Sequence, residues 1–370
     1  MSKIKLLLVV DAIGQDGTGR FVTHLANGLS ERSDFEVTLL TLHEEYGAFN
    51  NDISSGVKVE KLQLEGRIRF SLGMITRKIV ELQPNICFVL YTQLVFLSIL
   101  SPYLRFKGIR VYFRETIIPS MYRNHLNVVH KYLIRKAYNM YDGIIAQSND
   151  MANDLIEKWG CRNTKIEVVN NLVRSEKIQD RIKDLETPRD IIRTEKPVFI
   201  SAGRLAPQKG YEIIIKRIAE LKPQIPFTYY ILGDGEEKGK LEKMISENGL
   251  EDTVFLLGFK TNPYIYIKHA DALILSSRYE GFPNVVLEAM ALGKPVLSNT
   301  CLGGINEIII NGKNGIACDF ENKMSFTQGL TQFMNTKFDS SEIIDTIDSR
   351  YSKTAIMDKY ATFFQEEMKL

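Results

Sequence analysis

Two α/β domains, each built on a doubly wound parallel sheet, are predicted by two features of the chain. Short runs of Val, Ile and Leu alternate with amphipathic segments, as expected for parallel strands that helices bury on both faces. The chain has 370 residues, of which 44% are hydrophobic and 25% charged, and these values suit two ordinary globular domains. The predicted strands are 4–10, 37–42, 86–91, 110–113, 143–147 and 166–169, followed by 198–201, 228–232, 254–257, 272–276 and 296–299.

The domain boundaries follow from a break between these two series of strands. Residues 170–196 are polar, rich in charge and without aromatic side chains. We therefore predict an N-terminal domain over residues 1–171, a linker with room for a short helix over 172–195, and a C-terminal domain over 196–352. A helix over 353–370 is expected to pack back onto the first domain. Ligands of doubly wound sheets bind beyond the carboxyl ends of the strands, so we expect the functional cleft between the two domains.

Charge and cysteine usage exclude several classes of protein. The formal net charge of +2 gives no general attraction for polyanions, so nucleic acid is not an expected partner. No C-x-x-C spacing occurs, which argues against a disulfide framework and a zinc site and favours a reducing cytoplasm. The apolar run near the N-terminus has about seven residues, so we predict a buried strand rather than a signal peptide. No apolar stretch approaches the ~18–20 residues of a membrane-spanning helix, so any membrane contact is expected to be peripheral.

Basic and aromatic residues are concentrated between Ser101 and Met140. This region has eight Lys or Arg residues, seven aromatic residues and a single acidic residue, Glu115. Such a mixture is typical of a surface that contacts anionic membranes. We therefore expect the protein to be cytoplasmic and peripheral on the inner face of the plasma membrane. The alternative is a helix face and loop whose basic character has no such role.

The strongest candidate site is a pair of glutamates, Glu280 and Glu288, at a junction between an apolar strand and an amphipathic helix. Pro283 lies where the first helical turn needs no backbone donor, and the free N–H groups of a helix start attract phosphates. The spacing favours two separate contacts to one extended polar ligand over an acid/base pair. The alternative is an exposed turn glutamate and an unrelated solvated helix glutamate.

Cations that suit a diphosphate follow the first strand of the second domain. Gly203 ends that strand without a side chain, Arg204 offers a planar fork of donors, and Lys209 supplies a compact charge. The segment lacks P-loop spacing, and no Asp-x-Asp metal motif occurs in the chain, so we expect neither a metal ion nor another cofactor. The alternative is a surface loop with two solvated cations.

Glycine turns at other strand ends are further candidates for backbone contacts with a ligand. The loop around Gly17 has the order G-x-x-G-x-G, which differs from the dinucleotide fingerprint and gives little support to nicotinamide binding. The turns at Gly233 and Phe259 also follow predicted strands. Each of these turns can equally be an ordinary connection between a strand and a helix.

Taken together, these motifs resemble family 4 of the retaining glycosyltransferases, of the bacterial surface-polysaccharide type. The resemblance implies the GT-B architecture, in which two Rossmann-like domains face each other across a cleft and the C-terminal domain holds a nucleotide sugar. It is strong over residues 196–320 and thinner over the first 170. It rests on the Gly203–Gly210 segment, Gly233-Asp-Gly235, Glu280-Gly-Phe-Pro-Asn-x-x-Leu-Glu288, Gly303-Gly304-Ile-Asn-Glu307, Asn314-Gly315 and, near the N-terminus, Gly17-Thr-Gly-Arg20.

The resemblance also implies roles for the matched residues. Glu288 would accept hydrogen bonds from the donor ribose, and Glu280 would hold the transferred sugar near its anomeric carbon. Arg204 and Lys209 would stabilise the departing diphosphate, whose phosphate would itself take the acceptor proton. The implied catalytic group is Glu280, Arg204 and Lys209, and the expected donor contacts are Glu288, Gly17, Phe282, Pro283, Asn284, Val285, Gly203, Gly233 and Phe259.

The sequence departs from the family pattern at one strand end of the first domain. Many relatives carry a His there, whereas this chain reads Phe113-Arg114-Glu115-Thr116. We expect Arg114 and Glu115, together with Arg20, to contact the acceptor or the sugar. The alternative is a structural pair formed by Arg114 and Glu115.

The resemblance and the basic region together predict a transferase that moves a hexose, with UDP as the expected carrier, onto a lipid-linked oligosaccharide during assembly of O-antigen, capsule or a related polysaccharide. A soluble glycosyltransferase with a small-molecule or protein acceptor is one alternative. A catalytically silent subunit that binds nucleotide sugars is another. The sequence leaves the nucleotide base, the sugar, the linkage and the oligomeric state open.

Overall fold

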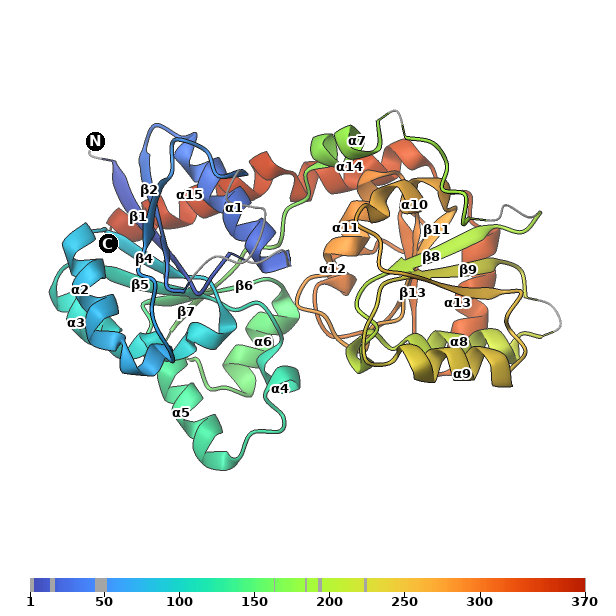
Figure 1. Ribbon diagram of the computed structural model, residues 1–370, viewed down its shortest axis with the longest axis horizontal. Helices are drawn as coiled ribbons and strands as arrows, with labels where there is room; N and C mark the ends of the chain where they lie inside the picture. Colours follow the sequence, from blue (N-terminus) through green and yellow to red (C-terminus); the bar gives the residue numbers. More distant parts are fainter. Residues whose placement is uncertain are drawn as a thin grey trace. The chain divides into compact units, whose positions relative to one another are not determined.

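Two compact units make up the chain (Figure 1). The computed structural model describes residues 3–13, 17–43, 52–162, 164–183, 185–191, 195–222 and 225–369, with the backbone alone at 17, 18, 92 and 93. Unit 1 comprises residues 1–171 together with 353–370, and unit 2 comprises residues 172–352. Each unit contains an open parallel sheet flanked by helices, with seven strands in unit 1 and six in unit 2. The predicted class, two doubly wound α/β domains, is confirmed.

The strands of unit 1 pair in the order β3-β2-β1-β4-β5-β6-β7. They are β1 (Ile4–Val10), β2 (Phe35–Thr41), β3 (Lys58–Lys61), β4 (Ile86–Val89), β5 (Arg110–Arg114), β6 (Gly143–Ala146) and β7 (Lys165–Val168). The helices are α1 (Gly17–Ser30), α2 (Leu72–Leu82), α3 (Ser101–Phe106), α4 (Pro119–Tyr122), α5 (Val128–Tyr138), α6 (Asn149–Glu157) and α15 (Lys353–Lys369), with short 3-10 helices η2 (Ile68–Phe70) and η3 (Thr92–Leu100).

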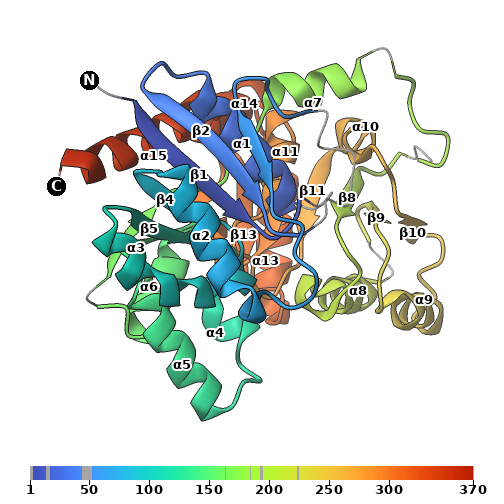
Figure 2. The ribbon, with the colours of Figure 1, turned by 60° about the vertical axis from the view of Figure 1, so that its left-hand side comes forward.

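Both faces of the central strands of the unit 1 sheet are buried, which explains the unbroken apolar runs of these strands. All five residues from Leu6 to Val10 of β1 are at most 1% exposed. One face of the sheet is covered by α1 and α15 (Figure 2). On that face the ring of Phe88 lies 5.4 Å from that of Phe364, and the ring of Tyr112 lies 5.3 Å from that of Phe363. Edge-to-face aromatic contacts therefore attach the C-terminal helix α15 to the sheet.

The strands of unit 2 pair in the order β10-β9-β8-β11-β12-β13. They are β8 (Val198–Ala202), β9 (Thr228–Leu232), β10 (Val254–Gly258), β11 (Ala272–Leu275), β12 (Val296–Asn299) and β13 (Gly315–Cys318). The helices are α7 (Ser175–Ile182), α8 (Tyr211–Glu220), α9 (Lys238–Glu247), α10 (Pro263–His269), α11 (Asn284–Ala291), α12 (Ile305–Ile308), α13 (Lys323–Asn335) and α14 (Ser340–Tyr351), with the 3-10 helix η4 (Pro207–Lys209).

The outermost strands β3 and β13 were not expected from the sequence. Both have four residues, and β3 is mostly exposed with two lysines and a glutamate, because it lies at a sheet edge. The polar side chains of β3 remove the apolar signal that central strands have. Strand β13 is mostly buried, and its four residues, Gly-Ile-Ala-Cys, are too short an apolar run to stand out. The range 172–195, predicted as a linker, lies within unit 2 and contains α7, whose Ile178 and Ile182 are buried.

Candidate functional site

In the sheet of unit 2, the order in which successive strands are added reverses between β8 and β11. From β8 the chain continues to β9 and β10 on one side and later returns to β11 on the other. In doubly wound sheets the loops that follow two such strands diverge, and ligands bind at this switch point. The predicted segment Gly203–Gly210 follows β8, and Glu280 lies in the loop that follows β11. Two of the sequence-predicted motifs therefore meet at the expected place in the sheet.

The Glu280 carboxylate is fixed by two donors that come from both sides of the switch point. Its Oε1 accepts a hydrogen bond from Lys209 Nζ at 2.7 Å and another from Ser277 Oγ at 2.6 Å. Glu280 is only 7% exposed, and Ser277 is 1% exposed. A carboxylate removed from water to this extent requires such partners, so Lys209 and Ser277 set its position and compensate its charge.

Backbone contacts join the same two loops. Arg278 N donates to Gln208 O at 2.8 Å, and the Gln208 side chain donates to Tyr279 O at 2.9 Å. Ser276 Oγ donates to Lys209 O at 2.8 Å. The two loops are therefore tied together independently of the ion pair, and Lys209 and Glu280 are presented from a common framework.

Glycines allow neighbouring loops to approach this framework closely. Gly303 has φ of +117°, and a Cβ built on it would lie 2.1 Å from the carbonyl oxygen of Glu280. A Cβ on Gly233, whose φ is +145°, would lie 1.9 Å from the carbonyl oxygen of Gly203. Only glycine adopts such conformations without strain, and no other side chain fits in the space. These glycines therefore have a steric role, whatever ligand contacts their backbones make.

The helix that carries Glu288 begins directly after the Glu280 loop. Pro283 is the N-cap of α11, and the Phe282 ring is buried 5.5 Å from that of Tyr351, so this ring is not accessible to a ligand. Glu288 is half-buried, and Tyr264 donates to its Oε1 at 3.1 Å. Glu280 and Glu288 thus lie on the two sides of a helix start, each with its own partner.

The remaining predicted donor contacts are more exposed or lie in unit 1. Arg204 is exposed, and its guanidinium forms no ion pair with any residue that the structure describes. Phe259 follows β10 and is 73% exposed. Asn284 and Val285 open α11 and are half-buried. Gly17 begins α1 in unit 1, and the loop before it, residues 14–16, lies outside the described residues.

The expected ligand contacts at Arg114 and Glu115 require correction. Arg114 is 1% exposed, donates from Nε to Tyr360 Oη at 3.0 Å, and lies over the Phe21 ring at 3.6 Å. Glu115 is fully buried and forms an ion pair with Arg123 at 3.1 Å. Both side chains are held in the interior of unit 1 by separate partners. They stabilise the packing there, and they do not form the direct pair considered from the sequence.

Sequence reasoning missed several polar residues at strand ends and at one helix start. Ser277 and Tyr264 carry no motif signal beyond a hydroxyl near Glu280 and at the start of α10. In unit 1, which has its own switch point between β1 and β4, Asp11 follows β1 and its carboxylate bonds to Nδ1 of His43. His43 Nε2 lies 2.8 Å from the carbonyl oxygen of Gly66. Two acceptors flank this ring, so both nitrogens donate, and these bonds raise the pKa of His43 above its ordinary value of 6.5.

Comparison with known proteins decides the family. Residues 15–177 match the family described as Glycosyltransferase Family 4, and residues 183–347 match the family described as Glycosyl transferases group 1. Together these matches include most of both units and every predicted donor contact discussed above. The chain belongs to the GT-B glycosyltransferases of the family 4 type.

Curated relatives of this glycosyltransferase match part of its length. An uncharacterized glycosyltransferase of Methanocaldococcus jannaschii is 34% identical over 199 residues, which are 53% of this chain and 48% of that protein. The N-acetylgalactosamine-N,N'-diacetylbacillosaminyl-diphospho-undecaprenol 4-alpha-N-acetylgalactosaminyltransferase of Campylobacter jejuni is 32% identical over 224 residues, which are 60% of this chain and 59% of that protein. The chain thus spans about half to three fifths of the length of these relatives.

Solved structures share the fold of this glycosyltransferase over nearly its whole length. The apo form of the lipopolysaccharide outer core galactosyltransferase WaaB has a TM-score of 0.75 at 20% identity, covering 98% of this chain and 100% of that one. HepE of Anabaena in complex with UDP has a TM-score of 0.76 at 18% identity, with the same coverage. At these identities the likeness establishes the fold alone.

A substitution at Gly303 tests the steric contact with the Glu280 loop. Gly303→Ala places a methyl group against the Glu280 carbonyl, so we expect the loop to shift and donor affinity to fall at least tenfold. Gly312→Ala is the matched control, because Gly312 also has positive φ, +80°, but its added Cβ would have no neighbouring atom within 4 Å. Isothermal titration with a nucleotide sugar measures both. Equal affinities in the two variants would contradict the steric role of Gly303.

The hydrogen bonds of His43 predict a pH-dependent stability. The folded-state pKa is raised, so the stabilisation is complete below pH of about 6.5 and disappears as pH rises through the folded pKa. We expect the melting temperature of the wild-type protein to fall more steeply than that of His43→Gln between about pH 6 and about pH 9. Thermal denaturation across this range gives the comparison. Parallel curves for the two proteins would show that His43 is not the titrating group.

Proposed function

We propose that this glycosyltransferase moves a hexosyl residue from a nucleotide-diphosphate sugar to a lipid-linked oligosaccharide during assembly of a bacterial surface polysaccharide, with retention of the anomeric configuration. The observation that carries the proposal is the Glu280 carboxylate, which Lys209 and Ser277 hold at the switch point of unit 2, next to the helix that bears Glu288. This arrangement supports the binding of an extended ligand with a sugar at one end and a ribose at the other.

Charge around the site supports a diphosphate between the sugar and the ribose of the proposed ligand. Lys209 shares its charge with Glu280, whereas the Arg204 guanidinium is exposed. Arg204 can thus form a bidentate contact with the diphosphate, and the positive end of the α11 dipole lies on the same side of the helix as Glu280. Glu288 accepts hydrogen bonds from the ribose hydroxyls, and Glu280 accepts them from the sugar. The occurrence of UDP in the HepE complex supports UDP as the carrier.

Retention follows from attack on the face that the diphosphate leaves. The bond between the anomeric carbon and the diphosphate oxygen breaks, and the acceptor hydroxyl oxygen forms the new bond on the same side. The acceptor proton passes to the departing phosphate oxygen, so no side chain has to act as a general base. Arg204 and Lys209 stabilise the charge that develops on the diphosphate, which is electrostatic catalysis by positioned donors.

Surface chemistry of unit 1 supports a membrane-bound acceptor. The single acidic residue between 101 and 140, Glu115, is buried with Arg123, so it does not reduce the positive charge of the surface. The name of the Campylobacter relative specifies a diphospho-undecaprenol acceptor. No helix in the described part of the chain is long and apolar enough to cross a membrane. We therefore propose a peripheral contact with the cytoplasmic face of the plasma membrane.

The cationic surface is smaller than the sequence suggests. Arg114 and Arg123 are buried, and Arg110 is half-buried against Glu367. The cations of this region that remain exposed include Lys107, Arg135 and Lys136, whereas the exposed Arg105 forms an ion pair with Asp142 at 2.8 Å. Exposed apolar side chains lie among them, including Phe106 at 83% and Val128 at 83%. The proposed membrane surface is thus formed by α3 and α5 rather than by the whole of residues 101–140.

Removal of the Glu288 carboxylate tests the donor site. A thermal-shift panel of nucleotide sugars first identifies the donor, since a ligand at ~100 times its dissociation constant stabilises by about 2.7 kcal/mol. Glu288→Ala then loses a charged acceptor of the ribose hydroxyls, so we expect kcat/KM for transfer to fall on the order of a hundredfold. Glu242→Ala, at an exposed position of α9, is the control with unchanged turnover. Wild-type turnover by Glu288→Ala would contradict the proposed donor site.

Removal of two exposed cations tests the membrane contact. Each Lys or Arg near an anionic bilayer contributes about 1 kcal/mol, so Arg135→Gln combined with Lys136→Gln is expected to weaken binding to phosphatidylglycerol vesicles about thirtyfold. Lys216→Gln combined with Lys243→Gln removes the same charge from unit 2 and serves as the control. Vesicle flotation at low and high salt gives the bound fraction. Equal flotation of both double variants would remove α5 from the proposed membrane surface.

A further inference from the structure

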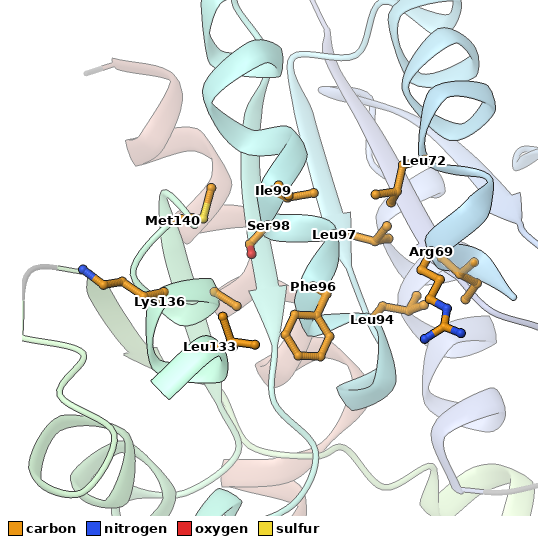
Figure 3. Close-up of a pocket in the computed structure, with 12 residues that line it drawn as sticks. Arg69, Leu72, Leu94, Phe96, Leu97, Ser98, Ile99, Leu133, Lys136 and Met140 are labelled. Carbon is orange, nitrogen blue, oxygen red and sulfur yellow. The ribbon is translucent and has the colours of Figure 1, made fainter. Parts of the chain in front are cut away.

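An apolar cavity of about 390 Å³ lies in unit 1, and its lining shares no residue with the candidate site of unit 2 (Figure 3). It is formed by residues of η2, α2, η3 and α5 and by Met140. Most of its wall is hydrocarbon, supplied chiefly by Leu72, Leu94, Phe96, Leu97, Ile99 and Leu133. Its volume is within the range of roughly 300–1,000 Å³ that is typical of sites for small ligands.

The cavity opens onto a surface that is itself apolar. Phe96, Ile99 and Leu133 line the cavity and are also 49%, 58% and 48% exposed. Nearby on η2 and α5, Phe70 is 78% exposed and Val129 is 65% exposed. Monomeric proteins rarely expose contiguous apolar surface of this kind without a partner for it. The occupant of the cavity therefore enters from an apolar phase or is itself largely hydrocarbon.

Two cations flank the cavity. Arg69 and Lys136 both line it, and Figure 3 shows their charged ends directed away from its apolar centre. The Arg69 guanidinium lies 4.7 Å from the centre of the Phe70 ring, and the Lys136 ammonium lies 5.6 Å from that of Tyr132. The stems of these side chains thus cover apolar surface while their charges remain at the rim. No carboxylate belongs to the lining that the structure describes.

We propose that this cavity binds one hydrocarbon chain of an anionic membrane lipid, with the lipid phosphate at Lys136, the cation that α5 contributes to the rim. The inference rests on the proposed function only for the contact with a membrane. A peptide is a poorer occupant, because Ser98 supplies the single side-chain hydroxyl of the described lining, and the N–H and C=O groups of a bound peptide would lose hydrogen bonds on burial. A hydrocarbon chain has no hydrogen-bonding groups to bury, and the negative phosphate of the lipid complements the positive charge at the rim.

Titration with monomeric short-chain phosphatidylglycerols, below the concentration at which they form micelles, tests the proposal without a bilayer. We expect saturable binding whose affinity rises about fourfold for each methylene added to the chain. Ala137→Met extends a side chain into the cavity from a position that is 4% exposed, and Leu133→Glu adds a charge at its rim, where folding is not at risk. Both are expected to lower the affinity at least tenfold.

Phe106→Ser is the matched control, since Phe106 is 83% exposed on α3 and does not line the cavity. It is expected to weaken vesicle flotation while leaving binding of the monomeric lipid unchanged.

Affinity that does not depend on chain length, or that Ala137→Met and Leu133→Glu both leave unchanged, would overturn the proposal. Equal affinity for the zwitterionic phosphatidylcholine analogue would overturn the role of Lys136. Donor binding and vesicle flotation are measured separately, so failure of the proposed function is distinguishable from failure of the cavity assignment.

Discussion

The ion pair between Lys209 and Glu280 is the interaction on which the candidate site depends. Its two residues are 71 positions apart in the chain, and they meet because β8 and β11 are neighbours in the sheet. A buried carboxylate remains ionised without a large cost in stability only while donors such as Lys209 and Ser277 contact it. The loops that carry these donors must therefore keep their positions for Glu280 to stay charged. Hydrogen bonds to the backbone of the two loops, together with the close packing of Gly303 against the Glu280 carbonyl, also hold these loops in place. The proposed donor site is thus ordered without a ligand.

Much of the fold could be predicted because its central strands are buried on both faces and are therefore apolar without interruption. β1 and β11 have this pattern, and so did most other strands that were expected. The edge strand β3 could not be found in the same way, since its exposed side chains are mostly polar, and β13 could not because its four residues, which begin with a glycine, form too short an apolar run. Helix α15 could be predicted from its periodicity, but its aromatic contacts with Phe88 and Tyr112 depend on tertiary packing that no local pattern contains.

In the candidate site, too, residues in local sequence patterns could be predicted, whereas residues whose role depends on tertiary contacts could not. Glu280, Lys209 and Glu288 could be selected because strand ends and helix starts can be read from the sequence, and because the motifs match a family. The partners Ser277 and Tyr264 could not, since a hydroxyl gains its role only when a carboxylate lies within hydrogen-bond distance. Arg114 and Glu115 occupy a strand end as expected, yet other elements bury them, and burial is decided by contacts far along the chain.

Helix α15 has a consequence for the order of folding during synthesis on the ribosome. Unit 1 is discontinuous, because its last helix is translated after the whole of unit 2. Until residues 353–369 emerge, one face of its sheet lacks the aromatic rings that cover Phe88 and Tyr112. Unit 2 has all its strands available before that point, whereas unit 1 must wait for its last helix to be translated. The first domain in the sequence is therefore the last to be completed, and its uncovered face is a natural substrate for chaperones in the interval.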